Sequence, residues 1–266
     1  FVFSAPLKYD CYNNLYKKLN AADKFIITFA SLFSSIVMGV NPDLALAIGT
    51  SKFDEFEENG LKYNLVAIGN PQYDRLIKLR QQMPVKDINQ IKNVLIIEQG
   101  AYPYGHIGKT QLADVLCHIA RSNPDKQFTV KPRYLPSEKG KQLHVLSEHL
   151  YDYIDNRPEN LILLDEPVVL EDIMQEFDAA ITTWSTAYLD AAILGLPIIL
   201  IEGLDSTDVY NVRRQRIQAA YDRLRHSGCV VNFKDLYNTP LPFKFVDETY
   251  LNEEINDPHH PCVPKI

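Results

Sequence analysis

Three polar residues in the second half of the chain, Ser185, Thr186 and Asp190, have types and a spacing that suit an anion beside a sugar. Hydroxyl groups at the start of a helix lie next to its free backbone N–H groups, and this combination binds anions. A carboxylate one turn further along can accept hydrogen bonds from sugar hydroxyls. The same Ser-Thr pair also suits a plain helix cap that binds nothing, so a structural role stays open.

A strand–turn–helix–strand unit is needed to position these residues. Residues 180–183 and 196–201 are apolar and rich in β-branched side chains, which predicts two buried strands. Residues 187–194 have the composition of a helix, and Gly195 follows as a stop signal. Such a unit belongs to a parallel sheet.

The same alternation extends from residue 94 to residue 233 and predicts a doubly wound parallel sheet of the α/β class. In these sheets, ligands bind beyond the carboxyl ends of the strands. Polar or flexible residues follow each predicted strand, and we expect them to converge on one crevice: Glu98 and Gly100, Lys131 and Arg133, Glu166, Ser185 and Thr186, and Glu202 and Gly203.

Changes of pattern along the chain predict two lobes. Residues 1–83 form a first, acceptor-side α/β lobe that is short or incomplete, and residues 84–93 are a polar stretch without periodicity that we interpret as a linker. Residues 94–240 form the second lobe. Residues 241–266 are rich in proline and are predicted to be an irregular tail. Because the chain opens on Phe1 rather than Met, we expect it to be a piece of something longer.

Composition excludes several classes of protein. A net charge of −7 argues against a nucleic-acid partner, which requires a basic surface. The four cysteines are far apart, so neither a disulfide framework nor a metal site is expected, and a reducing cytoplasm fits. Residues 25–40 are the most apolar stretch but are too short to span a bilayer, which leaves peripheral contact with the inner face of a membrane open.

Two motifs resemble known families. The pattern Ser185-Thr186-x-x-x-Asp190-Ala191-x-x-x-Gly195-x-Pro197 resembles the donor-domain signature of GT-B glycosyltransferases. The segment Gly69-Asn70-Pro71-Gln72-Tyr73-Asp74 is similar to the Gly-x-Pro-x-x-Asp segment near the end of the first domain in bacterial cell-surface polysaccharide transferases. CDP-glycerol polymerases of the teichoic-acid type carry similar versions of both motifs.

The resemblance implies two Rossmann-like lobes with a nucleotide-activated donor, a substrate rather than a cofactor, held mainly by the second lobe. Ser185 and Thr186 would bind the donor's phosphates, and Asp190 would bind the ribose or the transferred group. The segment Glu166-Pro167-Val168 would lie against the base. The acceptor would be a glycan or a lipid-linked glycan.

Three departures from the family pattern matter. Many relatives have Glu where this chain has Asp190, so the reach to a ribose is shorter. Lys131-Pro132-Arg133 replaces the His-Pro pair of some relatives, which removes a histidine acid but leaves two cations for a departing phosphate. The first lobe is also shorter than that of a full GT-B protein.

The predicted activity is therefore transfer of a sugar from a nucleotide donor in surface polysaccharide synthesis. Such a reaction needs a base for the acceptor hydroxyl, and Glu98 and His106, a residue in a predicted loop, are the candidates. No Asp-x-Asp pair is present to hold a metal between phosphates, so Lys131 and Arg133 are predicted to neutralise them without a metal. The alternatives are a CDP-glycerol-type glycerophosphotransferase and a non-catalytic nucleotide-binding domain of a larger synthase.

Overall fold

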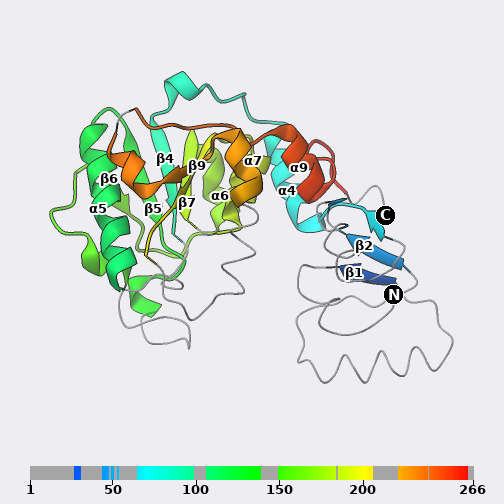
Figure 1. The fold of residues 1–266 in the computed structure, drawn as a ribbon, viewed down its shortest axis with the longest axis horizontal. Coiled ribbons are helices and arrows are strands. Elements are labelled where there is room, and N and C mark those ends of the chain that lie inside the picture. The colour runs from blue at the N-terminus through cyan, green and yellow to red at the C-terminus, as the bar shows by residue number, and fades with distance from the viewer. Residues whose placement is uncertain are drawn as a thin grey trace. The chain divides into compact units, whose positions relative to one another are not determined.

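The computed structural model describes residues 27–30, 44–47, 49–50, 53, 65–98, 106–138, 149–183, 185–205, 221–238 and 240–262 (Figure 1). The chain divides into two compact units, Phe1–Lys78 with Glu248–Ile266, and Leu79–Asp247. The strands of the two units belong to separate sheets, and within each sheet they run parallel. Parallel strands alternating with helices confirm the predicted α/β class.

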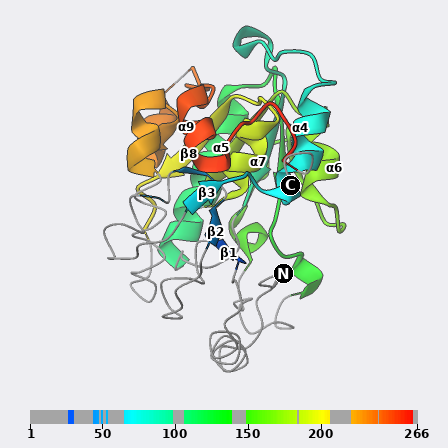
Figure 2. The ribbon, with the colours of Figure 1, turned by 90° about the vertical axis from the view of Figure 1, so that its right-hand side faces the viewer.

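The first unit contains a three-stranded sheet in which β1 (Ile27–Ala30), β2 (Leu44–Ala47) and β3 (Leu65–Ala67) lie side by side in that order (Figure 2). A short 3₁₀ helix, η2 (Pro71–Tyr73), follows β3 and leads directly into α4 (Asp74–Arg80). The side chain of Asn70 caps η2 by accepting a hydrogen bond from the N–H of Gln72 at 3.1 Å.

The C-terminal prediction needs correction, because part of the expected irregular tail is the helix α9 (Glu248–Ile255). The helix buries three side chains, those of Tyr250, Leu251 and Ile255, and belongs to the first unit. Its end packs so closely on Gly49 that a Cβ atom there would overlap the carbonyl oxygen of Glu253. The described prolines of this region, Pro242, Pro258 and Pro261, all lie outside the helix, so they do not prevent it.

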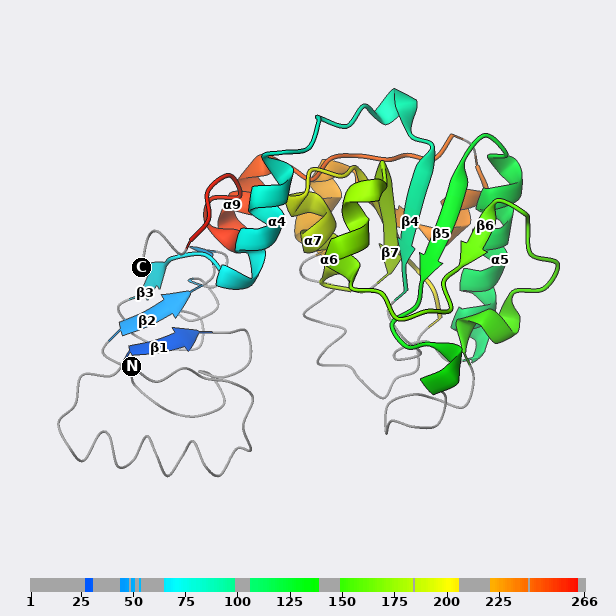
Figure 3. The same ribbon diagram turned by 180° about the vertical axis from the view of Figure 1, so that it is seen from behind.

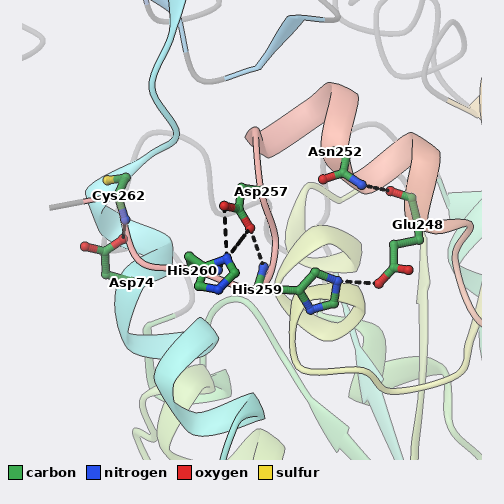
Figure 4. A network of polar contacts seen from close by, with 7 residues as sticks. All are labelled: Asp74, Glu248, Asn252, Asp257, His259, His260 and Cys262. Carbon is green, nitrogen blue, oxygen red and sulfur yellow. Dashed lines mark hydrogen bonds and ion pairs between the residues drawn. The ribbon is translucent and has the colours of Figure 1, made fainter. Parts of the chain in front are cut away.

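The Gly69-x-Pro71-x-x-Asp74 motif contacts the segment that follows α9 (Figure 4). Asp74 is only 6% exposed, and its Oδ1 accepts a hydrogen bond from the backbone N–H of Cys262 at 2.7 Å. Gly69 has φ +86°, and a Cβ atom there would lie 2.9 Å from the Cβ of Cys262. The motif therefore attaches the C-terminal segment to the first unit.

We expect Asp74→Ala to release this segment. The substitution removes a buried hydrogen bond to a charged acceptor, which is worth about 1.5–3 kcal/mol. Hydrogen exchange of the backbone amides of residues 256–262 should accelerate at least tenfold, whereas Asp74→Asn, which keeps an acceptor oxygen, should have a smaller effect. Asp125→Ala, at an exposed carboxylate of the second unit, is the control. Unchanged exchange in Asp74→Ala would show that the segment is held by other contacts.

The second unit is built on a sheet of six parallel strands in the order β6-β5-β4-β7-β8-β9 (Figure 3). The strands are β4 (Asn93–Ile97), β5 (Gln127–Lys131), β6 (Leu161–Leu163), β7 (Ala179–Thr183), β8 (Ile198–Glu202) and β9 (Val230–Asn232). Strand order reverses between β4 and β7, and this is the place where doubly wound sheets bind ligands. The predicted doubly wound sheet is confirmed.

Apolar side chains make this sheet the core of the unit. The four residues after Asn93 in β4, all of β7, and Ile198–Ile201 in β8 are buried. Parallel sheets covered on both faces have such continuous apolar strands. The helix α5 (His106–Ser122) packs against two 3₁₀ helices, η5 (Leu150–Tyr153) and η9 (Phe233–Tyr237), while α7 (Ala187–Ile193) packs against β7 and β8.

Asp178 binds residues of the predicted linker and the first residue of β4. Its Oδ2 accepts hydrogen bonds from the backbone N–H groups of Asn93 at 2.9 Å and Lys92 at 3.1 Å, and its Oδ1 lies 3.4 Å from the Nζ of Lys86. Partial burial alone would raise the pKa of Asp178, but these three groups together lower it. Residues 84–93 thus lie within the second compact unit, and the first unit ends earlier than predicted, at Lys78.

Candidate functional site

Two groups of sequence-predicted residues meet at the carboxyl ends of β4 and β5. Glu98 directly follows β4, and its backbone N–H donates a hydrogen bond to the carbonyl oxygen of Lys131 at 3.0 Å. The N–H of Arg133 donates in turn to Oε2 of Glu98 at 3.3 Å. We call residues 131–134, which leave β5 here, the β5 corner. Glu98 is therefore in direct contact with the segment that carries both candidate cations.

Glu98 is a buried carboxyl group, only 7% exposed. Burial raises the pKa of Glu98 above its ordinary value, although nearby groups offset part of this effect: the ring of His149, the N–H of Arg133, and the ammonium groups of Lys109 and Lys131. A carboxylate in such a place needs these partners, because an unpaired buried charge is costly.

Lys109 and His149 are members of this cluster that sequence reasoning missed. Lys109 is in the first turn of α5, is 2% exposed, and has its Nζ 5.8 Å from the centre of the Tyr153 ring. The Nε2 of His149 donates to the carbonyl oxygen of Tyr134 at 2.6 Å, while its Nδ1 accepts from the N–H of Tyr151 at 3.2 Å. His149 and Asp152 form a reciprocal capping box on η5, a spacing that the sequence does display.

Tyr151 connects the ends of β5 and β6. Its hydroxyl donates to the carbonyl oxygen of Leu164 at 2.7 Å and lies 3.1 Å from that of Val130. Burial, together with the carboxylates of Glu98 and Asp165, raises the pKa of Tyr151, so the phenol stays protonated and remains a donor. The first carbonyl after β6 is thereby fixed to the adjacent strand.

The connection from β6 to α6 (Leu170–Ile173) runs along the carboxyl edge of the sheet (Figure 3). At its start, Asp165 is close enough to Tyr151 to raise the pKa of that residue, and at its far end Glu171 does the same to Asp190 on α7. We call residues 164–169 the rim segment. Three members of it were predicted to contact a donor: Glu166 and Pro167 are exposed, and Val168 is half-buried.

The turn after β7 holds the other predicted group. Ser185 is buried, and its Oγ accepts a hydrogen bond from the N–H of Ala187 at 3.2 Å, so this hydroxyl serves at least as a cap of α7. Thr186 is exposed and makes no side-chain capping bond. The Oγ1 of Thr183, at the end of β7, is buried and has no hydrogen-bond partner within the described part of the chain.

Asp190 lies one turn into α7 and is half-buried. Burial, with the carboxylate of Glu171 as a second cause, raises its pKa from the ordinary 3.8 to about 7. The carboxyl group therefore exchanges its proton near neutral pH. It can either accept hydrogen bonds from hydroxyl groups as a carboxylate or donate one as an acid.

Two of the predicted site residues, Gly100 and His106, lie wholly or partly outside the described part of the chain. Gly100 lies outside the described residues. His106 is the first residue of α5, which corrects the prediction that it lies in a loop. The side chain of His106 lies outside the described part of the chain, so its predicted role as a base stays a prediction.

Several other polar groups are paired within their own unit. Both carboxylate oxygens of Glu202 pair with the guanidinium of Arg225 at 2.6 Å, so Glu202 has a structural use. His259 pairs with Glu248, and His260 with Asp257, in the network of the first unit (Figure 4). Within the described ranges, no group of three His, Cys, Asp or Glu side chains is arranged to hold a metal ion.

A family model described as "Putative glycosyltransferase (DUF6716)" matches residues 51–257, most of the chain and all the strands of the edge described above. The chain belongs to this family. No curated protein matches the chain in sequence. In the described part of this glycosyltransferase, no helix is both long enough and apolar enough to cross a bilayer.

Solved structures place this glycosyltransferase in the GT-B fold. The S. aureus MnaA–UDP co-structure has a TM-score of 0.52 at 11% identity, with 98% of this chain and 77% of that chain covered. The UDP-GlcNAc 2-epimerase of Methanocaldococcus jannaschii, in complex with UDP-GlcNAc and UDP, has a TM-score of 0.50 at 11% identity, with coverage of 96% and 80%. At this identity the likeness concerns the fold, and the predicted GT-B-like architecture is confirmed.

Proposed function

We propose that this glycosyltransferase takes a sugar from a nucleotide-activated donor and transfers it to a glycan or lipid-linked acceptor in surface polysaccharide synthesis, in the cytoplasm or at the inner face of the membrane. The observation that carries the proposal is the carboxyl edge of the six-stranded sheet. On both sides of the strand-order reversal it presents groups suited to a sugar nucleotide: the cations of the β5 corner, the rim segment and Asp190.

The edge has the dimensions for one extended ligand. Neighbouring strands lie about 4.8 Å apart, so the ends of β5 and β7, with β4 between them, are separated by about 10 Å. A nucleotide laid along this edge would meet Lys131 and Arg133 near one end and Thr186 and Asp190 near the other. The exposed Glu166 and Pro167, with Val168, then offer a surface for the base.

Sugar transfer breaks the bond between the sugar carbon and the donor phosphate while the acceptor oxygen forms a new one. The departing phosphate gains negative charge, which a cation or a helix N-terminus can stabilise. We assign this task to Lys131 and Arg133, without a metal. The acceptor hydroxyl must lose a proton, and Glu98 and His106 were predicted for that step; the burial of Glu98 favours a different role, which is argued below.

Calorimetry with CMP, CDP, UDP and GDP tests the proposal and identifies the donor class. We expect one nucleotide to bind at least tenfold more tightly than the others, and the matching nucleotide sugar to be turned over with an oligosaccharide acceptor. Transfer of glycerol phosphate from CDP-glycerol would instead establish the glycerophosphotransferase. Binding without turnover would favour a nucleotide-binding domain of a larger synthase, and no binding would refute the proposal.

Ser185→Ala combined with Thr186→Ala is expected to weaken nucleotide binding tenfold or more without unfolding the domain. Loss of a helix cap costs about 1 kcal/mol, whereas a hydrogen bond to a phosphate is worth about 1.5–3 kcal/mol. The single variants separate the two effects: Ser185→Ala should lower the melting temperature, because its hydroxyl caps α7, and Thr186→Ala should act mainly on affinity. Unchanged nucleotide affinity in the double variant would show that both residues only form the start of α7 and do not bind the nucleotide.

A further inference from the structure

We propose that Glu98 is a positioning residue and not the proton acceptor: together with His149 it fixes the β5 corner, so that Lys131 and Arg133 are preset for the donor's phosphates. The inference rests on the proposed function for the identity of the ligand. The fixing of the corner is a property of the fold and can be measured without any ligand.

Glu98, which follows β4, and His149 and Tyr151 at the start of η5 contact four backbone groups between Val130 and Tyr134. The carbonyl oxygen of Lys131 accepts a hydrogen bond from the N–H of Glu98, and the carbonyl oxygen of Val130 lies 3.1 Å from the hydroxyl of Tyr151. The N–H of Arg133 is bound by the Glu98 carboxylate, and the carbonyl oxygen of Tyr134 by the Nε2 of His149. Pro132 has no N–H to bind. These backbone groups are thus paired, although residues 132–134 belong to neither a helix nor a strand.

The Arg133 guanidinium is oriented by the same frame. Its Nε lies 3.4 Å from the hydroxyl of Tyr134, and its Cζ lies 5.6 Å from the centre of that ring. His149 holds Tyr134 through the backbone, and Glu98 holds Arg133 through the backbone. The side chain itself is exposed, so it is directed by its neighbours yet accessible to a ligand. A phosphate gains most from a cation whose position is set before the ligand arrives.

The surroundings of Glu98 fit this role better than catalysis. A base must reach the proton it removes, at about 2.6–3.2 Å between heavy atoms. Glu98 is 93% buried, and one of its oxygens already accepts the N–H of Arg133. A buried carboxylate that accepts a hydrogen bond from a backbone N–H group is well suited to fix the position of that backbone.

Glu98→Gln distinguishes the two roles. The amide keeps an oxygen that can accept from the N–H of Arg133 but cannot remove a proton. If Glu98 positions the corner, nucleotide affinity and kcat should stay within about fivefold of wild type and the pH profile of kcat should keep its shape. If Glu98 is the base, kcat should fall by a factor of 100 or more at unchanged affinity, and the acidic limb of the profile should disappear; this result overturns the proposal.

Glu98→Ala and His149→Ala provide the second measurement. Each releases one side of the corner, and we expect the backbone amide of Arg133 or of its neighbours to exchange at least tenfold faster in the free protein. The Kd for the nucleotide should rise by a similar factor. In turnover assays, KM should rise while kcat changes little. Wild-type exchange rates in folded Glu98→Ala would overturn the proposal even if nucleotides bind. If the wild-type protein binds no nucleotide, the proposed function fails, while the exchange experiment still decides whether Glu98 holds the corner.

Discussion

Arg133→Ala is expected to lower kcat/KM by about 100-fold, and a chelator such as EDTA should leave the wild-type activity unchanged. A guanidinium can bind phosphate oxygens bidentately, and removing one stabiliser of a developing charge typically costs two to three orders of magnitude, about 3–4 kcal/mol. Arg133 is exposed at the carboxyl edge, and within the described chain no carboxylate pairs with its guanidinium. Its exposed side chain is therefore accessible to a ligand at this edge.

Two further variants sharpen this test. Lys131→Ala should also lose activity, but less, because an ammonium group binds phosphate as a single compact charge. Lys126→Ala is the matched control: this lysine precedes the same strand at the opposite edge of the sheet and pairs with Asp125 at 2.9 Å. Activity that disappears with EDTA and returns with Mg²⁺ or Mn²⁺ would reject the metal-free mechanism, and an Arg133→Ala enzyme as active as Lys126→Ala would reject the role of Arg133.

The second unit could be predicted from sequence because each of its strands can be recognised from its own local sequence. Each buried parallel strand is a short apolar run bounded by turn residues, so its existence follows from local pattern alone. Most of the carboxyl-edge residues then follow from topology, since they lie at or shortly after the end of a strand. The meeting of Glu98 with Lys131 and Arg133 was foreseeable in this way, because β4 and β5 are adjacent in the sheet.

Features that depend on distant partners were not predictable. Lys109 looks like an ordinary charged residue on an amphipathic helix, and only the fold shows that it is buried beside Glu98. The role of His149 depends on a carbonyl group fifteen residues away. The helix α9 was missed because the prolines near it dominate the local pattern. Its stability depends on packing against Gly49 and on a segment held by Asp74.

Asp190→Asn is expected to stabilise the protein above neutral pH and to weaken nucleotide binding. The pKa of Asp190 is raised from 3.8 to about 7, so the folded state binds this proton more tightly than the unfolded state does. Stability contributed by the protonated carboxyl is complete below pH 4 and is lost as the pH rises to about 7. At pH 8 the ionised group carries the whole penalty, on the order of 2–4 kcal/mol. The neutral amide avoids that penalty.

Melting temperatures measured from pH 4 to pH 9 test this expectation. The variant should melt several degrees higher than wild type at pH 8, and the difference should vanish toward pH 4, because about 1 kcal/mol corresponds to 2–4 °C for a protein of this size. Glu171→Gln is the control: it removes the second cause of the raised pKa, so the transition should move to lower pH. If the melting temperature of Asp190→Asn is no higher than that of wild type at pH 8, burial of the ionised Asp190 does not destabilise the protein.

The affinity of the same variant decides why such a carboxyl group is present at the carboxyl edge. If Asp190 binds the hydroxyls of the ribose or of the transferred sugar, exchanging the carboxylate for an amide should raise the nucleotide-sugar Kd about tenfold, the value of one charge-assisted hydrogen bond reduced to a neutral one. Wild-type affinity should also fall as the pH drops below about 7 and the carboxylate takes up its proton, a dependence that Asp190→Asn cannot show. Asp190→Asn could instead prove more stable at pH 8 and bind the donor with wild-type affinity at every pH. That result would show that Asp190 does not bind the donor.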